Sequence, residues 1–129
     1  MRLKVLLPNE VLVDEEASEV VAEGGEGHFA LEPRHIDYVS ALVPGILSFL
    51  DASGREVFLA VDEGALVKTG DEVLVSCRRA VRGGDLGSLR RTVEETFRRL
   101  DDREKEARTA MAKIEAGFVR RFLDLARHG

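Results

Sequence analysis

The stretch ILSFLDASGREVFLAVDEGALVKTGDEVLVSC, residues 46–77, decides the fold of the larger, N-terminal part of the chain. Short apolar runs recur in it at intervals of about ten residues, and polar clusters containing glycine separate them. Gly54, Gly64 and Gly70 stand in these clusters, where a turn often needs the positive φ that glycine tolerates. This spacing is typical of antiparallel strands, so we predict a meander of four strands over Ile46–Cys77.

The preceding residues extend the same pattern. Leu3, Val5 and Leu7 alternate with charged residues, which predicts a strand with one face in a core and the other in solvent. The run over residues 57–61 is apolar throughout, which indicates a strand buried on both faces. Both kinds of strand fit a two-sheet antiparallel β-sandwich, which we assign to a first domain of residues 1–84.

The pattern changes abruptly at RGGD, residues 82–85. Gly83 and Gly84 form a hinge there, and Asp85 is a suitable helix N-cap. Beyond this point apolar residues recur every three or four positions. A second, helical domain is therefore predicted over residues 85–129.

The second domain contains either one helix or two, depending on whether the chain turns at Asp101. Neither proline nor glycine interrupts residues 88–116, which permits a single long helix. Asp101 followed by Glu104 resembles a capping box, which favours a second helix beginning there. We therefore predict a C-terminal α-helical hairpin, with one long helix as the alternative.

Composition excludes several classes of protein. The chain has 129 residues and a net charge of −5, and acidic residues outnumber basic ones in residues 1–84. This charge argues against a nucleic-acid partner, because phosphate binding needs a basic face. The one cysteine, Cys77, cannot form an internal disulfide, which favours a cytoplasmic location. No apolar run is long enough to span a bilayer, so direct membrane insertion is not expected.

The run EGGEGHF, residues 23–29, raises the question of a phosphate cradle, because successive glycine amides can converge on an anion. Glu23 and Glu26 would repel phosphate, and the run lacks the lysine of a P-loop. A phosphate site is therefore not predicted here.

Two histidines near this run raise the question of a metal site or a catalytic base. His28, His35 and Asp37 would supply the ligands, but Pro33 separates the histidines and the sequence marks no further ligand. Pro33 instead predicts a fixed, exposed loop. We predict no catalytic residue, no metal and no cofactor, while a small-ligand-binding sandwich with a helical lid and a metal-dependent enzyme stay as alternatives.

Several motifs follow one another in the order in which one family carries them. They are EGGEGHFALEPRHID at 23–37, LVPGIL at 42–47 and VFLAVDEGALVKTGDEVLVSCRRAVRGGDL at 57–86, followed by a charged helical tail. With these motifs the chain resembles the epsilon subunit of F-type ATP synthases over nearly its whole length. The form PRHID, in place of the commoner PGHAP, is most similar to the alternate, sodium-translocating F-type ATPases of some bacteria and archaea.

The resemblance implies a non-catalytic subunit that lies on the cytoplasmic face of the cell membrane. In this family the subunit binds the gamma subunit to form the central stalk, and its sandwich sits on the ring of c subunits. Rotation of that ring then reaches the catalytic head. The residues that the resemblance places against the polar loops of the c ring are Glu26, His28, Arg34 and His35. Those expected to contact gamma are Leu42, Pro44 and Ile46.

The resemblance also implies a role for the helical tail. In many family members the hairpin extends along the stalk, where basic residues meet an acidic segment of the catalytic beta subunits and inhibit ATP hydrolysis. The candidate residues are Arg90, Arg91, Arg98, Arg99, Arg120 and Arg121.

Some family members also bind ATP in the folded hairpin, through a motif of the form L-D-x-x-R-A. The corresponding stretch here is LGSLRR, residues 86–91, in which Leu86 and Arg90 agree with the motif. Gly87 replaces the acid and Arg91 replaces the alanine. This departure argues against nucleotide binding, for which Arg90 is the one candidate residue.

Overall fold

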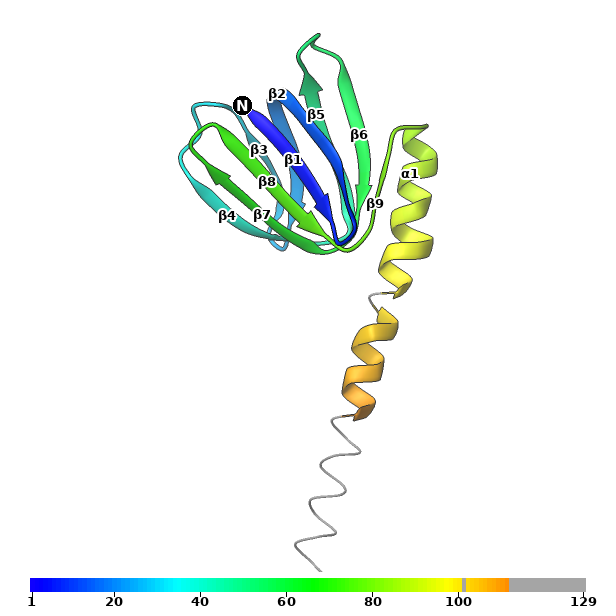
Figure 1. The fold of residues 1–129 in the computed structure, drawn as a ribbon. Helices are drawn as coiled ribbons and strands as arrows, with labels where there is room; N and C mark the ends of the chain where they lie inside the picture. Colours follow the sequence, from blue (N-terminus) through cyan, green and yellow to red (C-terminus); the bar gives the residue numbers. More distant parts are fainter. Residues whose placement is uncertain (101, 112–129) are drawn as a thin grey trace, which may run out of the picture. The chain divides into compact units, whose positions relative to one another are not determined.

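The computed structural model describes residues 1–100 and 102–111, and it shows nine β-strands followed by helix (Figure 1). The strands are β1 (Arg2–Leu7), β2 (Glu10–Gly24), β3 (Gly27–Leu31), β4 (Tyr38–Leu42), β5 (Gly45–Asp51), β6 (Glu56–Val61), β7 (Gly64–Thr69), β8 (Glu72–Cys77) and β9 (Ala80–Arg82). The helical elements are α1 (Leu86–Thr92), the π-helical turn η1 (Val93–Phe97), a helical continuation to residue 100, and a helix over 102–111. The predicted β-sandwich followed by a C-terminal helix is confirmed.

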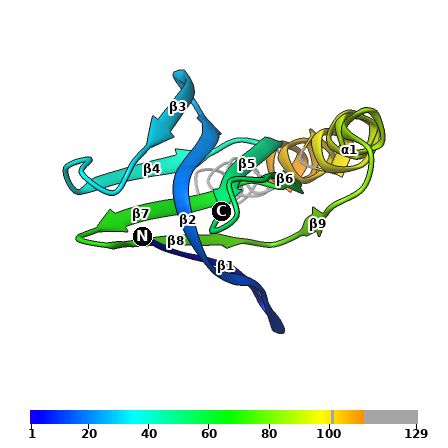
Figure 2. The ribbon, with the colours of Figure 1, turned by 90° about the horizontal axis from the view of Figure 1, so that it is seen from above.

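The strands lie in two layers that share one long strand, β2 (Figure 2). Residues 10–16 of β2 pair with β1, which continues through β8 and β7 to β4. Beyond Ala17, β2 pairs instead with β5 and β3, and β6 and β9 follow β5. A register irregularity between Ala17 and Glu19 lies where β2 changes partner, as expected because a bulge bends a strand. One hydrogen-bonded sheet therefore folds over itself around a single core.

The predicted meander of four strands is wrong. β5 pairs with β6 and β7 pairs with β8, but β6 pairs next with β9 and β7 with β4. The chain changes layer at Asp62, which is 1 % exposed and forms an ion pair with Arg79. A hairpin and a connection between layers use the same turn residues, so the turn chemistry in the sequence does not distinguish them.

The antiparallel arrangement has one exception, because β1 and β8 pair in parallel, with Arg2 opposite Glu72. A parallel pair needs a long connection, which the strands between β1 and β8 provide.

The main core fills the space between the two layers. Leu3 and Val5 on β1, Leu66 on β7, and Val73 and Val75 on β8 are all fully buried. They are alternate residues of their strands, which is the two-residue period expected for a half-buried sheet. Each side chain of this kind contributes about 1.5–3 kcal/mol on burial, so this cluster dominates the stability of the sandwich.

A second hydrophobic cluster lies beneath the helix, on the outer face of β5 and β6. We call it the helix cluster; it consists of buried Ala60, Leu89, Val93 and Phe97, bordered by half-buried Ile46 and Phe58. The helix members follow one another at steps of four, and an α-helix of 3.6 residues per turn would rotate such residues away from one line. The wider turn of η1 corrects this drift, so that all three reach the sheet.

The strands, α1 and η1 form one compact unit, Met1–Arg98, and Arg99–Gly129 forms a second. The predicted turn at Asp101 and most of the second apolar stripe lie outside the described residues, so the hairpin stays a prediction. No helix in the described part of the chain is both long enough and apolar enough to cross a membrane.

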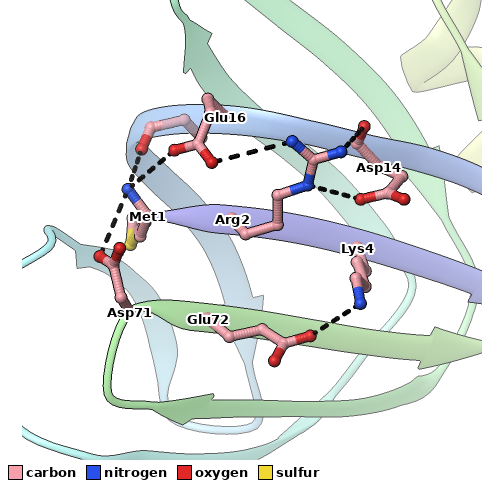
Figure 3. A network of polar contacts seen from close by, with 8 residues as sticks. Met1, Arg2, Lys4, Asp14, Glu16, Asp71 and Glu72 are labelled. Atoms are coloured by element: carbon pink, nitrogen blue, oxygen red, sulfur yellow. Dashed lines mark hydrogen bonds and ion pairs between the residues drawn. The ribbon is translucent and has the colours of Figure 1, made fainter.

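A polar network joins the start of β1 to its neighbours (Figure 3). The buried α-ammonium of Met1 donates to the carbonyl oxygen of Ala17 at 3.0 Å. The carboxylates of Glu16 and Asp71 lie 3.5 and 3.6 Å from the same nitrogen. The network thus connects β1 to β2 and to the turn before β8.

The next two side chains of β1 continue this network on the solvent face. Arg2 Nε donates to Asp14 Oδ1 at 2.7 Å, which lowers the pKa of the carboxyl and raises that of the guanidinium. Lys4 Nζ lies 3.3 Å from Glu72 Oε1. Exposed pairs such as these add little stability, but they favour one register of β1 between β2 and β8.

Candidate functional site

The loop over residues 32–37, which we call the contact loop, leaves β3 and returns into β4. It closes as a turn, because His35 N donates to Glu32 O at 2.9 Å. His35 Nδ1 lies 2.7 Å from Ile36 O and acts as the donor, since a carbonyl oxygen can only accept. Arg34 is exposed and Ile36 is 79 % exposed. The loop therefore exposes a cation and an apolar side chain to solvent.

The contact loop is tied to the turn between β7 and β8. Lys68 on β7 is 1 % exposed, and its Nζ donates to His35 O at 2.9 Å and to Gly70 O at 2.5 Å. Gly70 N donates in turn to Asp37 Oδ1 at 2.9 Å. The ring of His35 also stands edge-on to Tyr38, with centroids 5.7 Å apart. Lys68 was not among the residues predicted from the sequence to have a functional role.

The turn between β2 and β3 and the adjoining start of β3 carry the other two residues predicted to face the c ring. Glu26 and His28 are both exposed, and Gly27 between them has a φ of 117°, which favours glycine. The five residues of β3 span about 17 Å, so this turn and the contact loop lie at opposite ends of the strand (Figure 1). The four predicted residues thus form two groups: the turn pair, Glu26 and His28, and the loop pair, Arg34 and His35.

The same separation bears on the metal alternative. His28 and His35 cannot bind one ion together with Asp37, because the rest of β3 and the start of the contact loop lie between the two histidines. Within residues 1–100 and 102–111, no three His, Cys, Asp or Glu side chains are grouped as metal ligands. Burial, with Asp62 nearby, raises the pKa of Cys77 to about 11, which keeps this thiol protonated and weakly nucleophilic at neutral pH.

The predicted gamma contact lies between β4 and β5, and most of its side-chain surface is buried within the chain. Leu42 is 3 % exposed in the main core, Pro44 is buried, and Ile46 is half-buried against the helix cluster. The backbone is also closely approached, because a Cβ on Gly45 would lie 2.5 Å from Glu23 Oε2. A partner at this segment would meet its backbone and part of Ile46, so the gamma contact stays a prediction.

A cleft of about 410 Å³ separates this segment and His28 of the turn pair from the helix. It is lined by Glu23, His28, Gly45, Ile46, Arg90, Val93, Glu94 and Arg98. The Nη1 atom of Arg98 lies 2.5 Å from Glu94 Oε1, so acids and bases are mixed along its wall. This mixed charge does not single out a phosphate ligand, although Arg90 of the predicted nucleotide motif lines the cleft.

The stretch that corresponds to the nucleotide motif, residues 86–91, forms the first turns of α1. Asp85 Oδ2 accepts a hydrogen bond from Ser88 N at 3.2 Å, so this carboxylate serves as the N-cap. Gly87, at the position where the motif has an acid, supplies no side chain to a ligand. The departure from the motif at Gly87 and Arg91 therefore still argues against nucleotide binding.

The helix carries four of the residues predicted to contact the beta subunits, and all four are exposed: Arg90, Arg91, Arg98 and Arg99. The other two, Arg120 and Arg121, lie outside the described residues.

Comparison with known proteins identifies a family for this chain. The family model for the beta-sandwich domain of the ATP synthase delta/epsilon chain matches residues 1–83. ATP synthase epsilon chain 2 of Paraburkholderia xenovorans is 32% identical over 125 residues, covering 95% of this chain and 90% of that protein. ATP synthase epsilon chain 2 of Cereibacter sphaeroides is 32% identical over 130 residues, covering 99% and 87%.

Two solved structures share the fold. A chain of the mitochondrial ATP synthase of Euglena gracilis has a TM-score of 0.61 at 22% identity, over 72% of this chain and 61% of that one. A chain of the central stalk and c-ring of the Tetrahymena thermophila mitochondrial enzyme has a TM-score of 0.55 at 11% identity, over 77% and 94%. At these identities the likeness shows the fold alone. The match over residues 1–83 and the relatives at 32% identity show that this chain belongs to the family of ATP synthase epsilon chains.

Proposed function

We propose that this chain is the epsilon subunit in the central stalk of an F-type ATP synthase, where it couples rotation of the c ring to the catalytic head through gamma. The observation that carries the proposal is the family match over residues 1–83, which contain all nine strands of the sandwich. The subunit itself catalyses no reaction. The comparisons give no support to the alternative of a small-ligand-binding sandwich with a helical lid.

The sandwich has the mechanical properties that torque transmission needs. Its two layers are joined covalently by β2 and enclose a fully buried core. Because close-packed interiors have low compressibility, a force applied at one end of the sandwich reaches the other with little deformation.

The turn pair and the loop pair are the proposed contacts with the polar loops of the c ring. Each pair joins a histidine to a charged residue, Glu26 in one and Arg34 in the other. Polar pairing at an interface rim mainly sets register and encounter rate, so these contacts would orient the sandwich on the ring. Two supports at opposite ends of β3 would also resist tilting of the sandwich.

The proposed contact with gamma is the segment from Leu42 to Ile46. It lies beside the turn pair, because Leu42 is opposite Gly24 at the end of β2. Apolar burial against gamma would supply affinity there, mainly through the part of Ile46 that the helix leaves uncovered.

The exposed arginines of the helix are the proposed contacts with the beta subunits, through which the tail would inhibit ATP hydrolysis. Support comes from the small helix cluster, since within the described residues four buried side chains hold α1 and η1 on the sheet. Leaving the sheet would expose far less apolar surface than unfolding the sandwich would.

We further propose that the complex is of the alternate, sodium-translocating type and that the chain is held at the cytoplasmic face of the membrane by its partners. The support is the form PRHID and two relatives that are each named epsilon chain 2. ATP-driven sodium uptake into vesicles that contain the complex, persisting with a protonophore, is expected. Proton uptake alone would contradict the sodium assignment.

Binding to gamma is the direct test of the stalk assignment. We expect the chain and its matching gamma subunit, co-expressed, to elute together from a sizing column at micromolar concentration. Separate elution would rule out the assignment. Ile46→Glu should weaken the complex, whereas Arg55→Glu, an equally large change in the exposed β5–β6 turn, should not.

A further inference from the structure

Lys68 is a charged residue at a position that the strand period gives to the core. It stands two residues after fully buried Leu66 on β7 and is itself 1 % exposed. Burial of an ammonium is unfavourable unless hydrogen bonds replace its water. The structure supplies two such bonds, to the carbonyl oxygens of His35 at 2.9 Å and Gly70 at 2.5 Å.

The two acceptors belong to different loops. His35 is in the contact loop, and Gly70 is in the turn that joins β7 to β8. The carboxylate of Asp37 completes the connection by accepting from Gly70 N at 2.9 Å. The ammonium of Lys68 and the carboxylate of Asp37 thus both connect the contact loop to the β7–β8 turn. We call these three bonds the loop clamp.

The loop clamp determines how the outermost residues of the contact loop are presented. The His35 carbonyl belongs to the peptide that leads into Ile36, and Arg34 lies on its other side. Holding that carbonyl fixes the backbone from which both exposed side chains project. A surface ordered before binding loses less conformational entropy when a partner arrives.

We propose that Lys68 is a positioning residue, whose buried ammonium holds the contact loop and the β7–β8 turn together as one preorganised surface for the c ring. This inference rests on the proposed function of the loop pair. The proposed surface for the c ring then also includes Thr69, Gly70 and Asp71, which are all exposed beside the loop.

The test uses the full chain bound to gamma and, separately, to the complex of gamma with the c ring. Lys68→Met keeps the apolar stem and removes the donors. We expect affinity for gamma alone to be unchanged and affinity for the c-ring complex to fall about tenfold, the order of effect of losing hydrogen bonds to a charged group. Hydrogen exchange at the Gly70 and His35 amides should accelerate by a similar factor. Lys68→Arg should restore both in part.

The matched control is Lys4→Met, which removes a partly exposed ammonium from β1, the strand on the other side of β8 from β7. This control should leave unchanged both the affinity for the c-ring complex and the hydrogen-exchange rates of the Gly70 and His35 amides. If Lys68→Met behaves like Lys4→Met, the clamp is overturned. Equal losses of affinity for gamma and for the c-ring complex, accompanied by a lower Tm, would also overturn it, because Lys68 would then support only the core.

Asp37→Ala provides a second variant if Lys68→Met does not fold, because Asp37 is exposed and its loss leaves the core intact. The same selective loss of affinity for the c-ring complex is expected, and unchanged exchange at Gly70 would overturn the clamp. Arg34→Ala separates the two proposals. Should Arg34→Ala bind the c-ring complex normally, the proposed contact fails, while the exchange rates still decide whether Lys68 orders the loop.

Discussion

The main core of the sandwich and the helix cluster on its outer face differ in how strongly they hold the elements around them. The main core joins all the long strands and includes many fully buried side chains. The helix cluster has four buried residues, one from the sheet and three from the helix. Since stabilisation scales with the apolar area removed from water, the sandwich should behave as one rigid body and the helix as a detachable attachment.

The largest effect is expected from separating β7 from β8, two strands that carry main-core residues, by a substitution at Gly64. A Cβ there would lie 2.0 Å from Ser76 O and 2.9 Å from Cys77 Cβ, so Gly64→Ala must force β7 away from β8. We expect the free energy of unfolding, measured with urea, to fall by about 3 kcal/mol. The control is Gly25→Ala, where a Cβ would meet nothing within 4 Å and the change should stay below about 0.5 kcal/mol. Equal unfolding midpoints for the two variants would refute this packing argument.

An effect of similar size, but confined to the helix, is expected from Phe97→Ala, which removes the largest buried side chain of the helix cluster. Local opening of residues 86–98 should become easier by about 3 kcal/mol, seen as faster hydrogen exchange, while the strands keep their protection. Glu95→Ala, at an exposed position of the same turn, should change neither the exchange of residues 86–98 nor the protection of the strands. Unfolding of the strands together with the helix would show that the two clusters form one cooperative unit.

A smaller effect is expected at the start of the helix. Asp85→Ala removes the side chain that accepts from Ser88 N, which should weaken the first turn by about 1 kcal/mol. Exchange at the Ser88 and Leu89 amides should accelerate, with the strands unaffected. Asp85→Ser keeps a capping oxygen and should restore protection; a serine variant as unprotected as the alanine variant would argue against capping.

The smallest effect is expected from the exposed Arg2–Asp14 pair on the sandwich. The hydrogen bond from Arg2 lowers the pKa of Asp14 below its ordinary 3.8 in the folded state. The contribution of the Arg2–Asp14 pair to the stability of the fold is therefore present above pH 3.8. It is lost as the pH falls through the folded-state pKa of Asp14. The stability difference between wild type and Asp14→Asn, followed by urea unfolding, should shrink over that range and in high salt. A difference independent of pH would contradict the pairing.

Much of the local structure was predictable because local physics controls it. The two-residue period of β1, the glycine turns around Gly54 and Gly70, and the N-cap at Asp85 are all present in the structure. The contact loop was also expected, since Pro33 ends a strand by removing a backbone donor. Each of these features depends on residues only a few positions apart.

Strand pairing was not predictable in the same way. The connection at Asp62 carries the same turn residues as a hairpin, yet it leads into the other layer. The parallel pairing of β1 with β8 likewise depends on residues far apart in the chain. Both outcomes follow from which strands can bury their faces together, which is a property of the whole core.

The role of Lys68 could be predicted from the sequence only in part. Its spacing from Leu66 was a signal for the core face, because alternate residues of a strand share a side. A lysine is nevertheless expected at the surface unless it is paired, and its acceptors come from residues 35 and 70.

Four features could be derived from the residues alone: the order of the elements, the position of the contact loop, the start of the helix and the resemblance to an epsilon subunit. Three others became visible in the folded chain: β2 belongs to both layers, Glu26 and His28 lie at the opposite end of β3 from the loop pair, and Lys68 holds the contact loop. The physical reason is that backbone propensity and turn chemistry act between near neighbours. Burial and hydrogen bonding across a sandwich instead join residues that only the folded core brings together.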